Sequence, residues 1–66
     1  MKPQIGGLYK KINYDEYALV LDVDKFKGKY RVTYVIYSRD TRFNGEKYNT
    51  SIDGFRYLYA PYAPAT

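Results

Sequence analysis

The sequence predicts an all-β fold, in which four to five short antiparallel strands curl into a small barrel with one short helical or 3₁₀ turn. Two observations predict it. Apolar residues alternate with polar ones in the regular segments, where β-branched and aromatic types dominate. The chain also has only 66 residues, which is room for one domain. An open sheet of that size would expose strand edges that recruit other chains, whereas a curled or closed sheet hides them.

Aromatic residues are expected to provide most of the stability of this domain. The chain contains 10 Tyr and 3 Phe but no Cys and no His, so disulfides and thiolate or imidazole metal ligands are excluded. Each aromatic side chain can remove roughly 150–250 Å² from water, and tyrosine tolerates half-burial with a wet hydroxyl. Most of the tyrosines are therefore interpreted as structural.

The first half of the chain contains the strongest strand signals. Gly6 and Gly7 precede a short extended segment over residues 8–12, and residues 13–16 are typical of a turn. A long hairpin follows, with strands over residues 17–24 and 30–37 and a loop over residues 25–29 in which Gly28 takes a positive φ. One predicted face of the first strand holds Tyr17, Leu19, Leu21 and Val23, and the other holds Ala18, Val20, Asp22 and Asp24. The predicted apolar face of the second strand holds Tyr30, Val32, Tyr34 and Ile36.

The second half is predicted to contain another hairpin and a late turn. Residues 38–45 are polar and end in the turn dipeptide Asn44-Gly45, after which residues 46–51 pair back as a strand. Residues 51–55 form one helical turn before a last extended piece over residues 56–59. The rival interpretation is a short helix from Ser51, as N-cap, through Leu58. The domain is expected to span residues 1–59, and residues 60–66 to be an extended, Pro-containing tail.

The order Gly7-Leu8-Tyr9, a long central hairpin and then Ser51-Ile52-Asp53-Gly54-Phe55 before a final strand resembles the Src-homology-3-like small barrels. The absence of Trp makes the chain more similar to the KOW, Tudor and small bacterial or phage-encoded members than to the peptide-binding signalling domain. Its shape and tyrosine content also resemble small early bacteriophage proteins that bind and inhibit a host protein. This resemblance implies a fold and a binding role, and it implies no single function.

The residue types argue against an enzyme and against a cofactor. Without His or Cys, the usual nucleophile pairs and the usual general base are missing. Asp22 and Asp24 lie on one strand face, but a pair of carboxylates lacks the ligand number of a calcium site. Gly6-Gly7 matches neither a P-loop nor a dinucleotide fingerprint. We therefore expect a binding module with no cofactor and no metal.

Basic residues beside aromatic ones make nucleic acid the first partner hypothesis. The formal net charge is +4, and phosphates attract such a surface while tyrosine and phenylalanine offer stacking for unpaired bases. The clearest grouping is Arg39, Arg42 and Phe43 on the polar loop, with Tyr37 and Lys47 beside it. The complete predicted surface comprises Lys10, Lys11, Arg31, Tyr37, Arg39, Arg42, Phe43 and Lys47. The alternative is that these lysines and arginines only keep a small barrel in solution.

A protein partner is the second hypothesis, because tyrosine and arginine are the residues most enriched at interface hot spots. Tyr57, Tyr59 and Tyr62 are expected to form an exposed strip on the last strand and tail, or to pack across the barrel end instead. The same strip would support a weak homodimer, so a monomer or weak dimer is expected. No long apolar run and no signal segment is found, which predicts no membrane contact and a cytoplasmic location.

Overall fold

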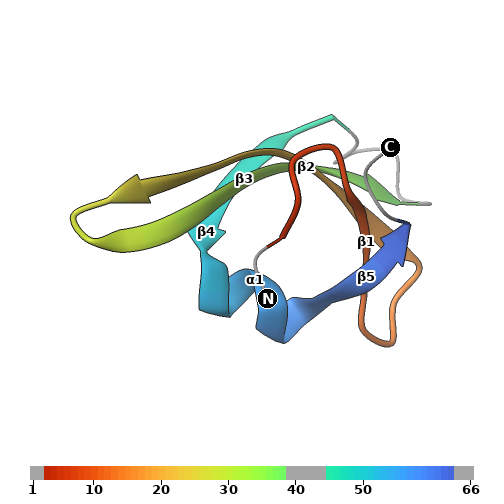
Figure 1. Cartoon of the computed structure of the whole chain (residues 1–66). Helices are drawn as coiled ribbons and strands as arrows, with labels where there is room; N and C mark the ends of the chain where they lie inside the picture. The colour runs from red at the N-terminus through yellow and green to blue at the C-terminus, as the bar shows by residue number, and fades with distance from the viewer. Residues whose placement is uncertain (1–2, 39–44, 64–66) are drawn as a thin grey trace.

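A computed structural model of the chain describes residues 3–38 and 45–63. It confirms the all-β class: five antiparallel strands form one sheet, and one short helix covers part of it (Figure 1). The elements are β1 (Leu8–Lys11), β2 (Glu16–Phe26), β3 (Lys29–Ser38), β4 (Lys47–Ser51), α1 (Ile52–Leu58) and β5 (Tyr59–Ala63). None of the helical segments in these two ranges is long and apolar enough to cross a membrane.

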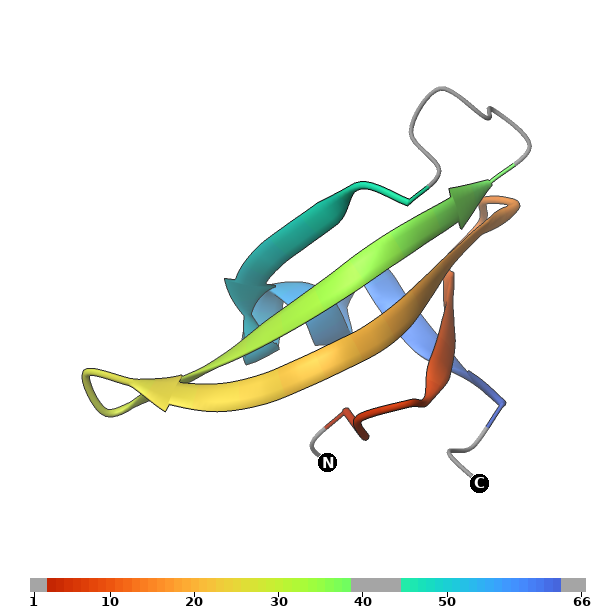
Figure 2. The same cartoon turned by 90° about the horizontal axis from the view of Figure 1, so that it is seen from above.

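The sheet has the strand order β4-β3-β2-β1-β5. The first four strands pair with their neighbours in sequence, and β5 returns to pair with β1. The edges of the sheet are therefore β4 and β5, and α1 joins them directly. Figures 1 and 2 show the sheet curling around the helix, so that it has a concave inner face and a convex outer face.

The β2–β3 hairpin is longer than predicted. Its pairs run from Glu16 opposite Ser38 to Phe26 opposite Lys29. The turn is therefore only Lys27-Gly28, with φ of 51° and 80°, instead of the predicted loop over residues 25–29. Positive φ at both central residues defines the type I′ turn, whose twist matches that of the flanking strands. The predicted positive φ of Gly28 is confirmed.

A β-bulge in β2 corrects the predicted faces of that strand. The register shifts by one residue between Val20 and Asp22, so Leu21 is the extra residue. Because a bulge adds one residue to its strand, the alternation of side chains between the two faces shifts by one position beyond the bulge. Consequently Ala18 and Val20 face inward before the bulge and Val23 faces inward after it, whereas Leu21 is exposed. The prediction that Tyr17, Leu19, Leu21 and Val23 share one face is wrong for this reason.

The segment after β4 is the short helix of the rival interpretation. The Ser51 hydroxyl accepts a hydrogen bond of 3.1 Å from the Gly54 backbone N–H, which caps the first turn of α1. The extended piece predicted over residues 56–59 is therefore wrong for residues 56–58, which belong to α1, and right only for Tyr59, which begins β5. A Cβ at residue 54 would lie 3.2 Å from the Ser51 hydroxyl and 3.0 Å from that of Thr50, so glycine leaves room for the cap.

The core lies between the inner face of the sheet and α1. Its buried members are Ala18, Val20, Val32, Tyr34, Phe55 and Tyr59, and Tyr9, Val23, Ile36, Tyr48 and Ile52 pack around them. The predicted inward position of Val32, Tyr34 and Ile36 is confirmed. The predicted boundary after residue 59 is wrong, because β5 continues through Ala63 and residues 60–63 belong to the sheet.

Candidate nucleic-acid interface

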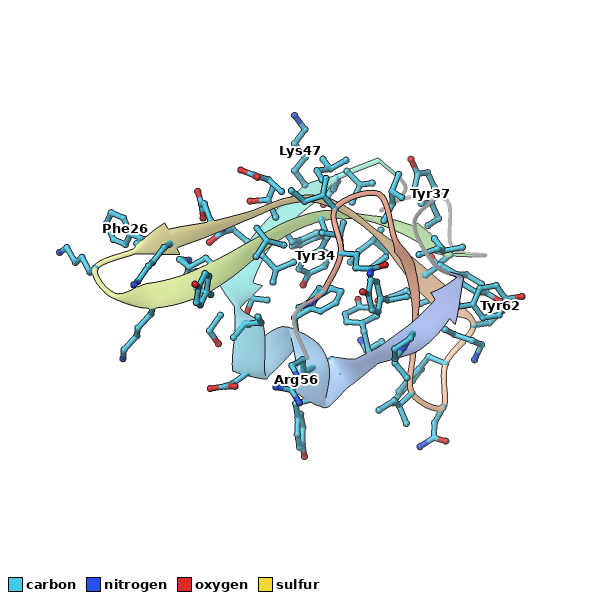
Figure 3. The ribbon with its side chains drawn as sticks, in the orientation of Figure 1. Phe26, Tyr34, Tyr37, Lys47, Arg56 and Tyr62 are labelled. Atoms are coloured by element: carbon cyan, nitrogen blue, oxygen red, sulfur yellow. The ribbon has the colours of Figure 1, made fainter. Side chains whose placement is uncertain are left out.

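The strand register aligns side chains of the outer face in rows that cross the sheet. Lys10 of β1 lies opposite Tyr17 of β2, which lies opposite Tyr37 of β3. These residues alternate with inward-facing neighbours, so all of them project from the outer face. We call Lys10, Tyr17 and Tyr37, together with Tyr62, which packs on Tyr17, the basic-aromatic row. In Figure 3, Tyr37 points away from the face that holds Tyr34.

Tyr62 extends this row onto β5. Its ring lies edge-on to the ring of Tyr17, with 5.1 Å between the ring centroids. Tyr37 and Tyr62 remain 45% and 59% exposed, so both rings are available to a ligand. Partial desolvation raises the pKa of Tyr17, and the nearby Tyr62 and Asp15 raise it further. Tyr17 is thus a neutral phenol at physiological pH.

A shallow hollow lies between the two central tyrosines of the row. Asp15, Tyr17, Tyr37 and Ser38 line it, and its volume is about 260 Å³. Two aromatic residues and two hydrogen-bonding side chains therefore border one concave patch. This combination suits a flat, polar ring such as a nucleobase, which stacks through its faces and forms hydrogen bonds through its edges.

The next row of the outer face is mainly apolar. Leu8, Leu19 and Val35 lie opposite one another on β1, β2 and β3, and Lys47 of β4 continues the row. Val35 is only 7% exposed, although it is outside the core cluster of the inner face. Lys47 projects from the same side of the sheet as Tyr37 (Figure 3). This second row therefore places the exposed ammonium group of Lys47 beside the aromatic residues of the basic-aromatic row.

Arg31 shares the outer face but lies away from the basic-aromatic row. It is six residues from Tyr37 along β3, about 20 Å at the usual rise of a strand. Its guanidinium donates to the Asn49 side-chain carbonyl, and the Asn49 amide donates to Thr33 Oγ1 at 2.9 Å. These bonds tie β3 to β4. Arg31 is thus a cross-strand bridge, which faces outward on the same sheet as Tyr37, as predicted, but lies outside the basic-aromatic row.

Lys10 and Lys11 lie on opposite sides of β1. Lys10 Nζ donates to the Tyr14 carbonyl oxygen at 2.8 Å, at the end of the basic-aromatic row. Lys11 faces the inner side, where its Nζ lies 3.7 Å from Glu16 Oε2. The same oxygen accepts a hydrogen bond of 2.7 Å from the Tyr59 hydroxyl. Of this predicted pair, only Lys10 belongs to the outer surface.

The remaining predicted residues divide into two groups. Arg39, Arg42 and Phe43 lie outside the described residues, in the connection that leaves β3 at Ser38. The predicted strip of Tyr57, Tyr59 and Tyr62 is not formed, because Tyr59 is only 4% exposed and belongs to the core. Tyr57 is 82% exposed on α1, and Tyr62 belongs to the basic-aromatic row instead.

Two features of the surface were missed at the sequence level. Tyr17 was interpreted only as a strand residue, because its position opposite Tyr37 depends on the bulge at Leu21. The tip of the β2–β3 hairpin exposes Phe26 among Lys25, Lys27 and Lys29. The sequence indicates that Lys25, Lys27 and Lys29 form a basic cluster, but it does not indicate that they surround an exposed ring beyond the end of the sheet. Among the described residues, no group of three or more acidic side chains could hold a metal ion.

Comparison of the chain with family models, with curated proteins and with solved structures finds no match. The resemblance to Src-homology-3-like barrels and to phage proteins therefore stays a prediction.

Proposed function

We propose that this protein is a non-enzymatic binding module that contacts single-stranded nucleic acid through the basic-aromatic row. The observation that carries the proposal is the continuous alignment of Lys10, Tyr17 and Tyr37 across three strands of the outer face. We also propose that the domain is an Src-homology-3-like barrel. The long central hairpin and the short helix before the last strand support that relationship.

The row supplies both interactions that a single strand requires. Exposed tyrosine rings stack on bases whatever their sequence, and ammonium groups attract the phosphates. Tyr17 and Tyr37 lie on adjacent strands, which are about 4.8 Å apart, so neighbouring bases can reach both rings. Lys10 and Lys47 lie at the two ends of this area, on β1 and β4. Binding should therefore be weakly dependent on sequence and strongly dependent on salt.

Fluorescence anisotropy with a labelled oligothymidine of about ten nucleotides tests the proposal, since OB folds, which are small β-barrels of similar size, cover about 4–16 nucleotides each. Tyr37→Ala should weaken binding by about 5- to 160-fold, because one base loses about 1–3 kcal/mol of stacking. Tyr57→Ala is the control, as it removes an even more exposed tyrosine, which lies on α1 and away from the row. Equal affinities of the two variants would remove the basic-aromatic row from the binding site.

A protein partner is the second candidate, and the apolar row favours it. Leu8, Leu19 and Val35 form a continuous aliphatic strip beside three tyrosines, which is the composition of an interface core. Capture from a cell lysate with and without nuclease, at low and at high salt, separates the two candidates. One defined protein recovered under all four conditions would support the second candidate and contradict the first.

A further inference from the structure

The β2–β3 hairpin projects beyond the rest of the sheet as a two-stranded ribbon (Figure 2). β1 accompanies β2 only as far as Leu19, and β4 accompanies β3 only as far as Arg31. Within the described part of the chain, residues 25–30 therefore pair only with one another, as Lys25 with Tyr30 and Phe26 with Lys29. The distal end of the ribbon is accessible from all sides.

This distal end is basic and carries one exposed aromatic ring. We call Lys25, Phe26, Lys27, Gly28 and Lys29 the basic fingertip; it contains three ammonium groups and no carboxylate. Phe26 is 58% exposed, and Lys27 Nζ lies 5.4 Å from the centroid of its ring. Lys25 Nζ lies 5.9 Å from the ring centroid of Tyr30 on the paired strand. Cation–π contacts of this kind hold the ammonium groups near the ring.

The turn contains a lysine at a position whose backbone conformation favours other residue types. Lys27 has φ of 51° at the first central position of the type I′ turn. That conformation favours asparagine, aspartate or glycine, and a lysine there costs stability. A residue in a sparsely populated backbone region is a reason to look for a function at that site. Here the function of Lys27 would be to place a positive charge at the end of the ribbon.

We propose that the basic fingertip is a second nucleic-acid contact, which inserts into the major groove of a duplex. A two-stranded β-ribbon fits that groove, which is about 12 Å wide and has phosphates along both walls. Lys25, Lys27 and Lys29 would neutralise those phosphates, and the Phe26 ring would lie against base edges such as the thymine methyl group. The ribbon has one exposed ring at its tip, which cannot stack a run of unpaired bases, so a duplex suits it better than a single strand.

This inference rests on the proposed function, because both assume that the ligand is nucleic acid, and it adds a second binding site. Lys29 and Tyr37 are eight residues apart on β3, about 27 Å at the usual rise of a strand. That distance corresponds to about eight base pairs along a duplex axis. The two contacts therefore do not compete for the same nucleotides. The substrate class that engages both is nucleic acid in which a duplex adjoins a single-stranded segment.

Two substitutions test the fingertip, measured by anisotropy with a duplex of about 20 base pairs and with one of its strands alone. Lys27→Asn removes one charge and creates the Asn-Gly pair that a type I′ turn prefers, so the variant folds at least as well as the wild type. It should weaken duplex binding about fivefold at 0.15 M salt and lower the log–log salt slope by about 0.9, the effect of one released counterion. Phe26→Ala should also weaken binding to the duplex. Neither substitution should change single-strand affinity by more than about twofold.

The matched control is Arg56→Gln, which removes one charge from α1. Figure 3 shows Arg56 and Phe26 on separate parts of the molecule. If Lys27→Asn and Arg56→Gln weaken duplex binding equally, net charge alone explains binding and the fingertip proposal is wrong. The proposal is also overturned if the fingertip variants leave duplex affinity unchanged.

The same experiment keeps the two proposals apart. Loss of single-strand binding in Tyr37→Ala, with no effect of either fingertip variant on the duplex, would leave the proposed function standing and reject the fingertip. Duplex binding that depends on Lys27, with no single-strand binding by the wild type, would do the opposite. A wild type that binds neither probe would reject both.

Discussion

The two faces of the β2–β3 hairpin use the same residue type for different purposes. On the inner face, Tyr34 lies with its ring centroid 5.1 Å from that of Phe55 and 5.6 Å from that of Tyr59. The rings of Phe55 and Tyr59 are themselves stacked at 4.9 Å. On the outer face, Tyr37 lies only three residues further along β3 and is 45% exposed. Position relative to the sheet, and not residue type, decides which tyrosines stabilise and which are available for binding.

The hydroxyl groups follow the same division. The Tyr59 hydroxyl is buried with the ring and donates a hydrogen bond of 2.7 Å to Glu16 Oε2. Burial, above all, and the nearby Glu16 carboxylate raise the pKa of Tyr59 well above its ordinary value. On the outer face, Tyr62 is 59% exposed and its ring touches only the edge of Tyr17 among the described rings. A buried phenol therefore requires a hydrogen-bond partner within the protein, whereas an exposed phenol remains available to a ligand.

The largest expected effect is at the centre of the inner face. Phe55→Ala removes a side chain that is 1% exposed and contacts three other rings, so it should cost about 3–5 kcal/mol of unfolding free energy. A chain of 66 residues has about 3–10 kcal/mol in total, so the variant should lose at least about a third of its stability. Circular dichroism with urea denaturation measures it. Tyr57→Ala, on the same helix, should change stability by less than about 0.5 kcal/mol.

The hydroxyl of Tyr59 provides the second test. Tyr59→Phe leaves the ring but removes the hydrogen bond to Glu16, and should cost about 1–2 kcal/mol near neutral pH. The tyrosine pKa is 10.0 in the unfolded chain and raised in the folded one, so its stabilising effect is complete below pH 10. Above pH 10 the unfolded chain releases the proton first, and stability falls by up to about 1.4 kcal/mol per pH unit.

Urea denaturation between about pH 8 and pH 11 measures this dependence. The stability difference between the wild type and Tyr59→Phe should shrink as the pH rises above 10. Some alkaline dependence should persist in the variant, because burial also raises the pKa of Tyr34. A difference that stays constant over the whole range would show that the phenol is not shielded in the folded protein.

Removal of the helix cap, also on the inner side of the sheet, is expected to have a smaller effect on stability. Ser51→Ala removes the acceptor of the Gly54 N–H and should cost about 1 kcal/mol, which lowers the melting temperature by about 4–8 °C in a domain of this size. Ser51→Asp keeps an acceptor at the same position and is the control. If both variants melt at the wild-type temperature, the cap does not contribute to holding α1 against the sheet.

The smallest effect on stability is expected on the outer face. Tyr37→Ala should change the unfolding free energy by no more than about 0.5 kcal/mol, because the side chain is exposed and outside the core cluster. The same variant should lose much of its single-strand affinity. A large loss of stability here would mean that the two faces do not differ as described, and would make the binding result uninterpretable.

Much of the inner face could be predicted from the sequence. The alternation of Val32, Tyr34 and Ile36 identifies the core face of β3 because side chains of a strand point to alternate sides. Gly28 locates the central turn, and the serine at residue 51 identifies the helix cap. The conformation of residues 56–58 could not be predicted, because Arg56 favours a helix and Tyr57 a strand, and the choice depends on packing Phe55 into the core.

The candidate site could be predicted only in part. The sequence predicts Lys10, Tyr37 and Lys47, which lie near one another on the outer face. It predicts Lys11 and Arg31 with them, but Lys11 faces inward and Arg31 bridges β3 and β4 through Asn49. The sequence predicts the lysine cluster of the fingertip but not a site there, because its importance comes from its projection beyond β1 and β4. The lengths of those two strands, and not the sequence of the hairpin, decide that projection.

The all-β class and the central hairpin follow from local features of the chain, since alternation and turn chemistry involve only neighbouring residues. Which tyrosines lie side by side depends instead on how the strands pair. Counting back from the Lys27-Gly28 turn without a bulge would pair Tyr37 with Ala18, whereas the extra residue at Leu21 pairs it with Tyr17. One inserted residue reverses the faces of a strand, and the packing of Ala18, Val20 and Val23 against a shared core selects where that reversal occurs.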